Sequence, residues 1–418
     1  MTLDEAAATL ARGALPPGAE LLKRSPVRSV ARVGDAVVKV LHRRARKARR
    51  EARALAHARA LGVPVPELLA HGSDWVATRF VDARPAARDD LAAFLPTVLA
   101  MHARGMLHGD LHLGNILMRG REPLLLDVQK ASFWPALPAW LRRRELGYLA
   151  HSLGDPLPAP LAATWRWRAL RSHSHWRSRT KRCLVESSGF TAFEAAGARG
   201  FRRREIAAAA LARALADAPA TPPLKRSAHG ALHRVGGWIV KRHASVARAR
   251  RAWICGVGLE VRGIGAARPL AWAGPWLVME DAGPTLIDWV QDALAQASAA
   301  EREALADAAA TLLARLHARG IYHPDLKANN ICWTPGHAPR LLDYADVRFG
   351  IAVSQRRRVK NLAQLNAALP DSVPAELRER ALARYLAELG ASSRDDAARL
   401  RRDVVELSVK RRHLWSGC

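Results

Sequence analysis

The chain has 418 residues, 49% of them hydrophobic and 25% charged, which is typical of a globular protein long enough for two domains. Its 66 Lys and Arg residues against 38 Asp and Glu residues give a formal net charge of +28. This charge disfavours cationic substrates and favours a phosphorylated substrate, an anionic membrane surface or nucleic acid. No run is long and apolar enough to span a bilayer, the acidic start MTLDEAAATL is unlike an export signal, and the four cysteines are scattered. These features predict a cytoplasmic protein with no disulfide framework and no zinc site.

The first half begins with short β-rich runs on either side of a glycine turn. The runs VARV and AVVKV flank Gly34-Asp35, which predicts a hairpin. An Arg- and Ala-rich helix follows over residues 42–60, then strands around Trp75, then a long helix that ends at His102. The loop HGDLHLGNIL and the apolar strand LLLD come directly afterwards. The basic, Trp-rich stretch TWRWRALRSHSHWRSRTKRC then predicts a closing helix of this domain.

The second half repeats the first, block by block and in the same order. LKRSPVRSVARVGDAVVK aligns without gaps on LKRSAHGALHRVGGWIVK, with nine of eighteen positions identical. HARGMLHGDLHLGNI matches HARGIYHPDLKANNI at nine of fifteen positions. A match of this kind over several ordered blocks indicates tandem duplication of a whole domain. The predicted domains are residues 1–218, closed by the segment at about 164–218, and residues 219–418.

Each half is rich in strands at its start and in helices at its end, so the predicted fold is α+β with two lobes per domain. The ordered blocks resemble the protein-kinase-like phosphotransferases. Within that group they resemble most the bacterial lipopolysaccharide kinases of the Kdo and heptose type. The cue for the narrower resemblance is the segment LDVQKASFWPALPAWLRRRELGYLAHSL, which stands where protein kinases have an activation segment.

The resemblance implies a role for a small set of residues in each half. An ammonium group on a strand binds the ATP phosphates and is held by a helix carboxylate, and a loop Asp orients the acceptor hydroxyl. An Asn and a strand-end Asp bind Mg²⁺, which prefers oxygen ligands. In the first half these residues are Lys39, Glu51, Asp110, Asn115 and Asp127. In the second half they are Lys241, Asp325, Asn330 and Asp343, joined by Lys327, which matches the lysine that protein kinases aim at the transferred phosphate.

Several departures from the kinase pattern make each half imperfect. Neither half has G-x-G-x-x-G, so the phosphate-covering loops would be residues 25–29 and 227–231. Ala252 aligns with Glu51, so Lys241 has no evident acidic partner unless Glu260 supplies it. Likewise Arg144-Glu145-Leu146 becomes Lys360-Asn361-Leu362, which loses the acid.

Three functions follow from these patterns. The first is an ATP- and Mg²⁺-dependent kinase acting on a sugar hydroxyl of lipopolysaccharide core or a related glycolipid. A basic surface suits this anionic acceptor and peripheral contact with the inner face of the membrane, and it disfavours the polycationic substrates of aminoglycoside phosphotransferases. The second is a Ser/Thr protein kinase, favoured by HPDLK but lacking an A-P-E segment. The third is a partly degenerate kinase-like scaffold with one pseudokinase half. Nucleic acid is not an expected partner.

Overall fold

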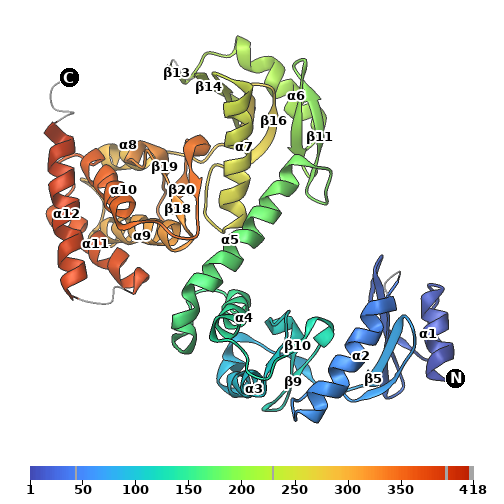
Figure 1. Cartoon of the computed structure of the whole chain (residues 1–418). Coiled ribbons are helices and arrows are strands. Elements are labelled where there is room, and N and C mark those ends of the chain that lie inside the picture. Colours follow the sequence, from blue (N-terminus) through green and yellow to red (C-terminus); the bar gives the residue numbers. More distant parts are fainter. Residues whose placement is uncertain (43–44, 228–229, 391–393, 414–418) are drawn as a thin grey trace. The chain divides into compact units, whose positions relative to one another are not determined.

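The computed structural model describes residues 1–42, 45–227, 230–390 and 394–413. The chain divides into two compact units, Met1–Arg171 and Ser172–Cys418 (Figure 1). Helix α5 (Trp165–Lys181) crosses this division. In the part of the chain that the structure describes, no helix combines the length and the apolar character needed to cross a membrane.

The first unit opens with an antiparallel sheet of order β1-β2-β3-β5-β4. Side chains alternate between the faces of a strand, so Val38 and Val40 of β3 point toward α1, whereas Lys39 points to the opposite face, where α2 lies. Leu10 of α1 is fully buried in the first of these layers. The elements are α1 (Leu3–Ala11), β1 (Glu20–Ser25), β2 (Arg28–Val33), β3 (Ala36–Val40), α2 (Ala45–Ala60), β4 (Leu68–His71) and β5 (Trp75–Arg79).

The rest of the first unit is mainly helical and contains the His-x-Asp loop. Phe94 and Val98 of α3 are fully buried in a core shared with α2, which joins the helical part to the sheet. Two short antiparallel sheets, β6-β8-β9 and β7-β10, hold the loops between the helices. The elements are β6 (Arg84–Pro85), α3 (Leu91–Ala103), β7 (Met106–Leu107), β8 (Ile116–Arg119), β9 (Glu122–Leu125), β10 (Ser132–Phe133) and α4 (Ala139–Ser152).

The second unit also opens with an antiparallel sheet, of order β11-β12-β16-β17-β15-β14-β13. The part β16-β17-β15-β14-β13 follows the same path as the sheet of the first unit. Val240 of β15 points to α6, whereas Lys241 points to the other face, as Lys39 does in β3. The elements are β11 (Phe190–Ala195), β12 (Ala198–Arg203), α6 (Ala208–Asp217), β13 (Lys225–Ser227), β14 (Gly230–Val235), β15 (Trp238–His243), α7 (Val246–Val261), β16 (Pro269–Ala273) and β17 (Trp276–Glu280).

The sheet of the second unit carries a hairpin that the predicted boundary at residue 218 did not anticipate. Strands β11 and β12 pair with each other, and β12 pairs with β16 through Gly200 and Ala273. The close approach requires glycine, because a Cβ on Gly200 would lie 1.8 Å from the Trp272 carbonyl oxygen. Residues 190–203 therefore belong to the second unit, although they precede the repeated block.

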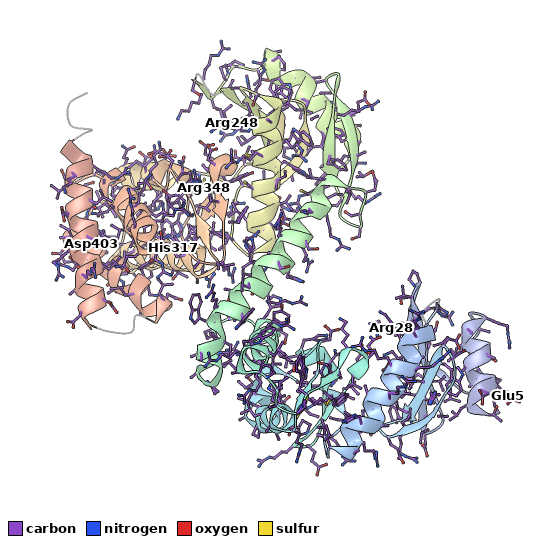
Figure 2. All side chains as sticks on the ribbon, in the orientation of Figure 1. Glu5, Arg28, Arg248, His317, Arg348 and Asp403 are labelled. Carbon is purple, nitrogen blue, oxygen red and sulfur yellow. The ribbon has the colours of Figure 1, made fainter. Side chains whose placement is uncertain are left out.

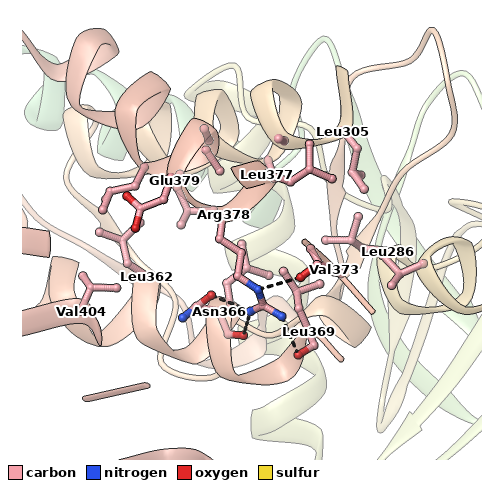
Figure 3. A pocket seen from close by; sticks show the side chains of 18 of the residues that line it. Leu286, Leu305, Leu362, Asn366, Leu369, Val373, Leu377, Arg378, Glu379 and Val404 are labelled. Carbon is pink, nitrogen blue, oxygen red and sulfur yellow. Dashed lines mark hydrogen bonds between the residues drawn. The ribbon is translucent and has the colours of Figure 1, made fainter. Parts of the chain in front are cut away.

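The helical part of the second unit surrounds an apolar cavity of about 130 Å³ (Figure 3). Leucines of α8, α9, α10 and α11 line it, together with Val404 of α12. Arg378 closes one side, where its guanidinium donates hydrogen bonds to the carbonyl oxygens of Asn366, Leu369 and Val373. The elements are α8 (Leu286–Asp292), α9 (Ala299–Ala318), β18 (Ile321–Tyr322), β19 (Ile331–Cys332), β20 (Arg340–Leu341), β21 (Arg348–Phe349), α10 (Gln355–Ala368), α11 (Ala375–Leu389) and α12 (Arg394–His413).

Candidate active site

In the first unit, three of the predicted residues meet beneath the sheet. Lys39 Nζ lies 2.9 Å from Glu51 Oε1 on α2 and 2.6 Å from Asp127 Oδ1, directly after β9. The Lys39 side chain is 13% exposed and that of Glu51 7%, so both ion pairs are shielded from solvent. Burial raises the pKa of Glu51, and the nearby Lys39 only partly offsets this effect. The structure thus forms the predicted strand Lys and helix Glu pair.

Asp127 is held by a second cation from the predicted phosphate-covering loop. Arg28 lies 3.2 Å from Asp127 Oδ2, and its side chain is labelled in Figure 2. Burial alone would raise the pKa of Asp127, but Lys39 and Arg28 outweigh burial and lower it. Asp127 has a backbone φ of 60°, in the left-handed region that Asp tolerates better than most residues. Its carboxylate is therefore ionised and fixed toward the sheet.

The His-x-Asp loop of the first unit brings Asp110 and Asn115 together. Asn115 Nδ2 donates to the backbone oxygen of Asp110 at 2.9 Å, and Lys130 Nζ lies 2.8 Å from Asp110 Oδ2. His108 is fully buried and bonds through Nε2 to the Leu126 carbonyl oxygen at 2.8 Å. Burial lowers the pKa of His108, so the ring is neutral and Nε2–H is the donor. His108 therefore ties the loop to the segment that carries Asp127.

A buried carboxylate behind this loop was not assigned a role from the sequence. Glu145 of α4 accepts hydrogen bonds from the backbone N–H groups of His108 at 3.1 Å and Gly109 at 2.6 Å, and from His102 Nε2 at 2.9 Å. Glu145 is only 4% exposed, so these donors supply the polar contacts that its charge requires. The sequence signal was the acid in Arg144-Glu145-Leu146, but its donors lie more than 35 positions earlier in the chain.

The second unit repeats the lysine and strand-end aspartate but not the helix acid. Lys241 Nζ lies 2.7 Å from Asp343 Oδ1, and Asp343 has a φ of 45°, like Asp127. Burial opposes the effect of Lys241, which nevertheless lowers the pKa of Asp343. Ala252 of α7 is buried and offers no charge.

Glu260 does not compensate for Ala252. It lies in the last turn of α7, where it forms an ion pair with the buried Arg203 of β12, and its Oε1 lies 3.7 Å from Arg268 Nε. Arg203 is the last residue of β12, in the hairpin that the predicted boundary did not anticipate, and Arg268 directly precedes β16. The acid that the sequence left as an open alternative to Ala252 therefore pairs with Arg203 and Arg268 and not with Lys241.

The second His-x-Asp loop gathers Asp325, Lys327 and Asn330. Lys327 Nζ lies 3.0 Å from Asp325 Oδ2. Asn330 Nδ2 donates to the Asp325 backbone oxygen at 2.8 Å and to Oδ2 at 3.2 Å. The Asp325 side chain is 57% exposed, so it is open to an acceptor.

Behind this second loop, amides replace the carboxylate. Asn361 of α10 is fully buried, donates to the His323 carbonyl oxygen at 2.5 Å and bonds His317 Nε2 at 3.2 Å. Gln364 Nε2 donates to the Pro324 carbonyl oxygen at 2.7 Å. The loop thus presents acceptors to these side chains, whereas the first loop presents N–H donors to Glu145.

A cavity of about 350 Å³ lies between the sheet and the second loop. Lys241, Asn330 and Asp343 line it. Glu280, the last residue of β17, and the following segment Asp281–Gly283 also line it. This volume falls in the range of small-molecule sites, and the lining combines apolar strand residues with a few polar groups.

The comparison with protein families falls on this same region. Residues 275–386 match the model of the lipopolysaccharide kinase (Kdo/WaaP) family. The chain is a kinase-type phosphotransferase. The match lies within the second unit and spans Asp325, Asn330 and Asp343, and it confirms the resemblance predicted from the sequence.

The other comparisons add little to this match. No curated protein matches the chain. Among solved structures, a choline/ethanolamine kinase family protein from Mesorhizobium loti is 17% identical with a TM-score of 0.29, covering 43% of this chain and 84% of its own.

ATP and a divalent metal ion are the cofactors that a kinase of the matched family implies, and the residues present fit them. Lys241 lines the cavity as a partly shielded cation, which suits phosphate. Asn330 and Asp343 offer oxygen ligands, and Mg²⁺ is bound by one or two such side chains plus phosphate oxygens and water. The described residues contain no group of three or more His, Cys, Asp or Glu side chains that could hold a metal ion.

Proposed function

We propose that the protein is an ATP- and Mg²⁺-dependent kinase that phosphorylates a hydroxyl of a lipopolysaccharide-core or related glycolipid sugar. One observation carries this proposal. The cavity lined by Lys241, Asn330 and Asp343 lies in the unit that matches the lipopolysaccharide kinase family, beside the exposed Asp325.

Each residue of the second unit has a role in this proposal. Bound ATP supplies the phosphoryl group, and Mg²⁺ neutralises charge on the phosphates. Lys241 Nζ binds phosphate oxygens, and Asn330 and Asp343 hold the metal ion. Asp325 Oδ2 orients the acceptor hydroxyl and accepts its proton, while Lys327 neutralises the charge that develops beside it.

We propose that the first unit is a second kinase-like domain that arose by tandem duplication. Helices α1 and α6 cover the same face of the two sheets, and Lys39 and Lys241 occupy the same strand on the opposite face. The matching roles are phosphate binding by Lys39 with Glu51, hydroxyl orientation by Asp110, and metal binding by Asn115 and Asp127. The two units differ in these residues, because Glu51 pairs with Lys39 in the first unit whereas Ala252 stands at the aligned position of the second. This difference favours phosphoryl transfer in one unit only.

The acceptor class follows from charge as well as from the family. A net charge of +28 favours an anionic glycolipid at the cytoplasmic face of the membrane, where each Lys or Arg near the headgroups contributes about 1 kcal/mol. A Ser/Thr protein kinase remains the alternative, supported by HPDLK alone.

Transfer of radiolabelled phosphate from ATP tests the proposal. Purified inner-core glycolipid and a generic protein are offered as acceptors to the wild type, Asp325→Asn and Asp110→Asn, with the exposed Asp292→Asn of α8 as the matched control. We expect label in the glycolipid and a loss of about 10²-fold or more in Asp325→Asn, because the hydroxyl proton then has no acceptor. Label in protein alone would favour a protein kinase, and ATP binding without transfer would favour a scaffold. Loss in one of the two Asp variants supports divided labour, and equal partial losses contradict it.

A further inference from the structure

A strongly basic cavity of about 580 Å³ lies in the first unit, outside the residues considered so far. One wall is a single face of α2, where Arg46, Arg49, Arg50 and Arg53 follow one another at helical spacing and His57 continues the stripe. The opposite wall is formed by Ala131 and Phe133, in the segment that follows Asp127. No acidic residue is among those lining the cavity.

The four arginines lack the counter-ions that other basic residues of this unit have. Lys39, Arg79 and Arg84 each contact a carboxylate within 3.0 Å. Across residues 1–42, 45–227, 230–390 and 394–413, no carboxylate lies within ion-pair distance of the α2 guanidinium groups that line the cavity. Like charges three or four positions apart on a helix repel each other. An anion between them would remove that repulsion and accept bidentate hydrogen bonds from the guanidinium groups.

The cavity also has a flat aromatic surface. The His57 ring stacks on Phe133, with ring centroids 4.0 Å apart and an angle of 13° between the planes. Arg50 reaches across to the Ala131 carbonyl oxygen at 3.4 Å, which links the two walls. Guanidinium groups beside an aromatic face suit a ligand that has both anionic groups and a ring with apolar C–H edges.

The position of the cavity connects it to the His-x-Asp loop. Lys130, the neighbour of Ala131, holds Asp110 Oδ2 at 2.8 Å. A ligand bound against Ala131 and Phe133 therefore sits beside the segment that positions Asp110. Such a place suits the charged part of an acceptor rather than a nucleotide, whose proposed phosphate partner Lys39 lies under the sheet.

The second unit lacks this arrangement. At the aligned positions α7 carries Ala247, Arg250, Arg251, Ile254 and Gly258, so two of the four arginines and the histidine are missing. A Cβ on Gly258 would lie 2.9 Å from the Phe349 ring, which leaves no room for a larger side chain. Arg248, labelled in Figure 2, instead forms an ion pair of 2.7 Å with Asp346. The cluster is thus a property of the first unit.

We propose that this cavity binds a phosphate-bearing saccharide, the anionic headgroup of the glycolipid acceptor. The inference rests on the proposed function for the identity of the ligand, and it gives the first unit a substrate-holding role. The arginines bind the phosphate groups, and the His57–Phe133 pair packs against a sugar ring.

Equilibrium binding to the full-length protein tests this inference without requiring transfer. The probe is a deacylated, phosphorylated inner-core oligosaccharide, compared with the same oligosaccharide after phosphatase treatment, with sodium phosphate and with a short single-stranded RNA. The variants are Arg49→Gln/Arg53→Gln and, as a control with equal charge loss, Arg250→Gln/Arg251→Gln on α7; all four side chains are exposed. A further variant, His57→Ala, removes the ring contact without changing the arginines.

We expect the α2 double variant to bind the phosphorylated oligosaccharide at least tenfold more weakly and the α7 control to change binding less than twofold. His57→Ala should weaken binding of the oligosaccharide but not binding of sodium phosphate. Equal losses of oligosaccharide binding in both double variants would mean attraction by net charge alone and would overturn the proposal. RNA or sodium phosphate that binds more tightly than the oligosaccharide, and that loses affinity in the α2 double variant, would also overturn it. If the wild type transfers no phosphate but its oligosaccharide binding still depends on the α2 arginines, the kinase function is contradicted and the cavity is not. If the wild type transfers phosphate but the α2 double variant binds the oligosaccharide as tightly as the wild type, the cavity is contradicted and the kinase function is not.

Discussion

The backbone N–H of Gly109 donates a hydrogen bond of 2.6 Å to Glu145 Oε1, and the second unit changes both members of this pair. Pro324 replaces Gly109 and has no N–H to donate, and Asn361 replaces Glu145. Asn361 and Gln364 donate instead to the carbonyl oxygens of His323 and Pro324. The loss of the acid in Lys360-Asn361-Leu362 is therefore matched by a change in the loop, because a side-chain donor replaces a side-chain acceptor. It is not by itself a sign that the second unit has lost activity.

This exchange predicts that an acid is harmful at position 361. In Asn361→Asp, the carboxylate faces the His323 carbonyl oxygen without a hydrogen to donate, at a fully buried position. We expect the free energy of unfolding to fall by about 2–4 kcal/mol, the cost of an unpaired buried polar or charged group. Gln355→Glu makes the same exchange at an exposed position of α10 and should be neutral or slightly stabilising, because it lies in the first turn. Denaturant unfolding followed by tryptophan fluorescence measures both, and equal stability of the two variants would contradict the argument.

Local sequence patterns predicted the parts of the site that depend on nearby residues. The Gly34 hairpin, the strand lysines and the two His-x-Asp loops each lie within a short segment, so spacing and turn chemistry were enough. The role of Glu145, the pairing of Glu260 with Arg203 and the place of residues 190–203 depend on contacts tens of positions apart. Such contacts are set by sheet order and helix packing, which a single sequence does not display.

The Lys39–Glu51 ion pair predicts a measurable but modest contribution to the stability of the first unit. Glu51→Gln removes the charge that Lys39 contacts at 2.9 Å, while Asp127 continues to hold the ammonium group. We expect a loss of about 1.5–3 kcal/mol, typical of a hydrogen bond to a charged group. Glu67→Gln breaks an exposed pair with Arg79 and should change stability less than Glu51→Gln does, because water screens the exposed charges. A larger loss in Glu67→Gln than in Glu51→Gln would show that burial does not set the strength of these pairs.

The partners of Glu260 predict that it has no part in nucleotide binding. Glu260→Gln should leave the dissociation constant for ATP within twofold of the wild type, because its carboxylate contacts Arg203 and Arg268. Lys241→Ala should weaken ATP binding at least tenfold, since Lys241 lines the cavity. Glu260→Gln should instead lower stability by about 1–2 kcal/mol, because it leaves the buried Arg203 without its anion. Calorimetric titration with ATP and thermal unfolding separate the two effects, and weakened ATP binding in Glu260→Gln would reopen its assignment to Lys241.

Two buried histidines predict that the second unit loses stability in mild acid. Burial lowers the pKa of His317 to about 4, and burial together with the nearby Lys241 lowers the pKa of His243 to about 4, from an ordinary value of 6.5. Between pH 6.5 and 4 the unfolded chain binds protons that the folded chain does not, so the free energy of unfolding falls as the pH falls. Each histidine can lower the free energy of unfolding by up to about 3 kcal/mol as the pH falls through this window. Above pH 6.5 this loss is absent and the full stability is present.

The two histidines differ in their partners, which makes the effect separable. His317 is labelled in Figure 2; it bonds Asn361 through Nε2 and the Tyr385 hydroxyl through Nδ1 at 2.7 Å. Neither ring nitrogen of His243 has a hydrogen-bond partner among the described residues, and Leu41 stands at the aligned position of the first unit. His243→Leu should therefore stabilise the protein by about 1 kcal/mol at pH 7 and flatten the acid dependence, because a buried unsatisfied group is removed. Denaturant midpoints measured from pH 4 to 8 test this, with the exposed His337→Leu as control, and an unchanged slope in His243→Leu would mean that His243 does not remain neutral in the fold.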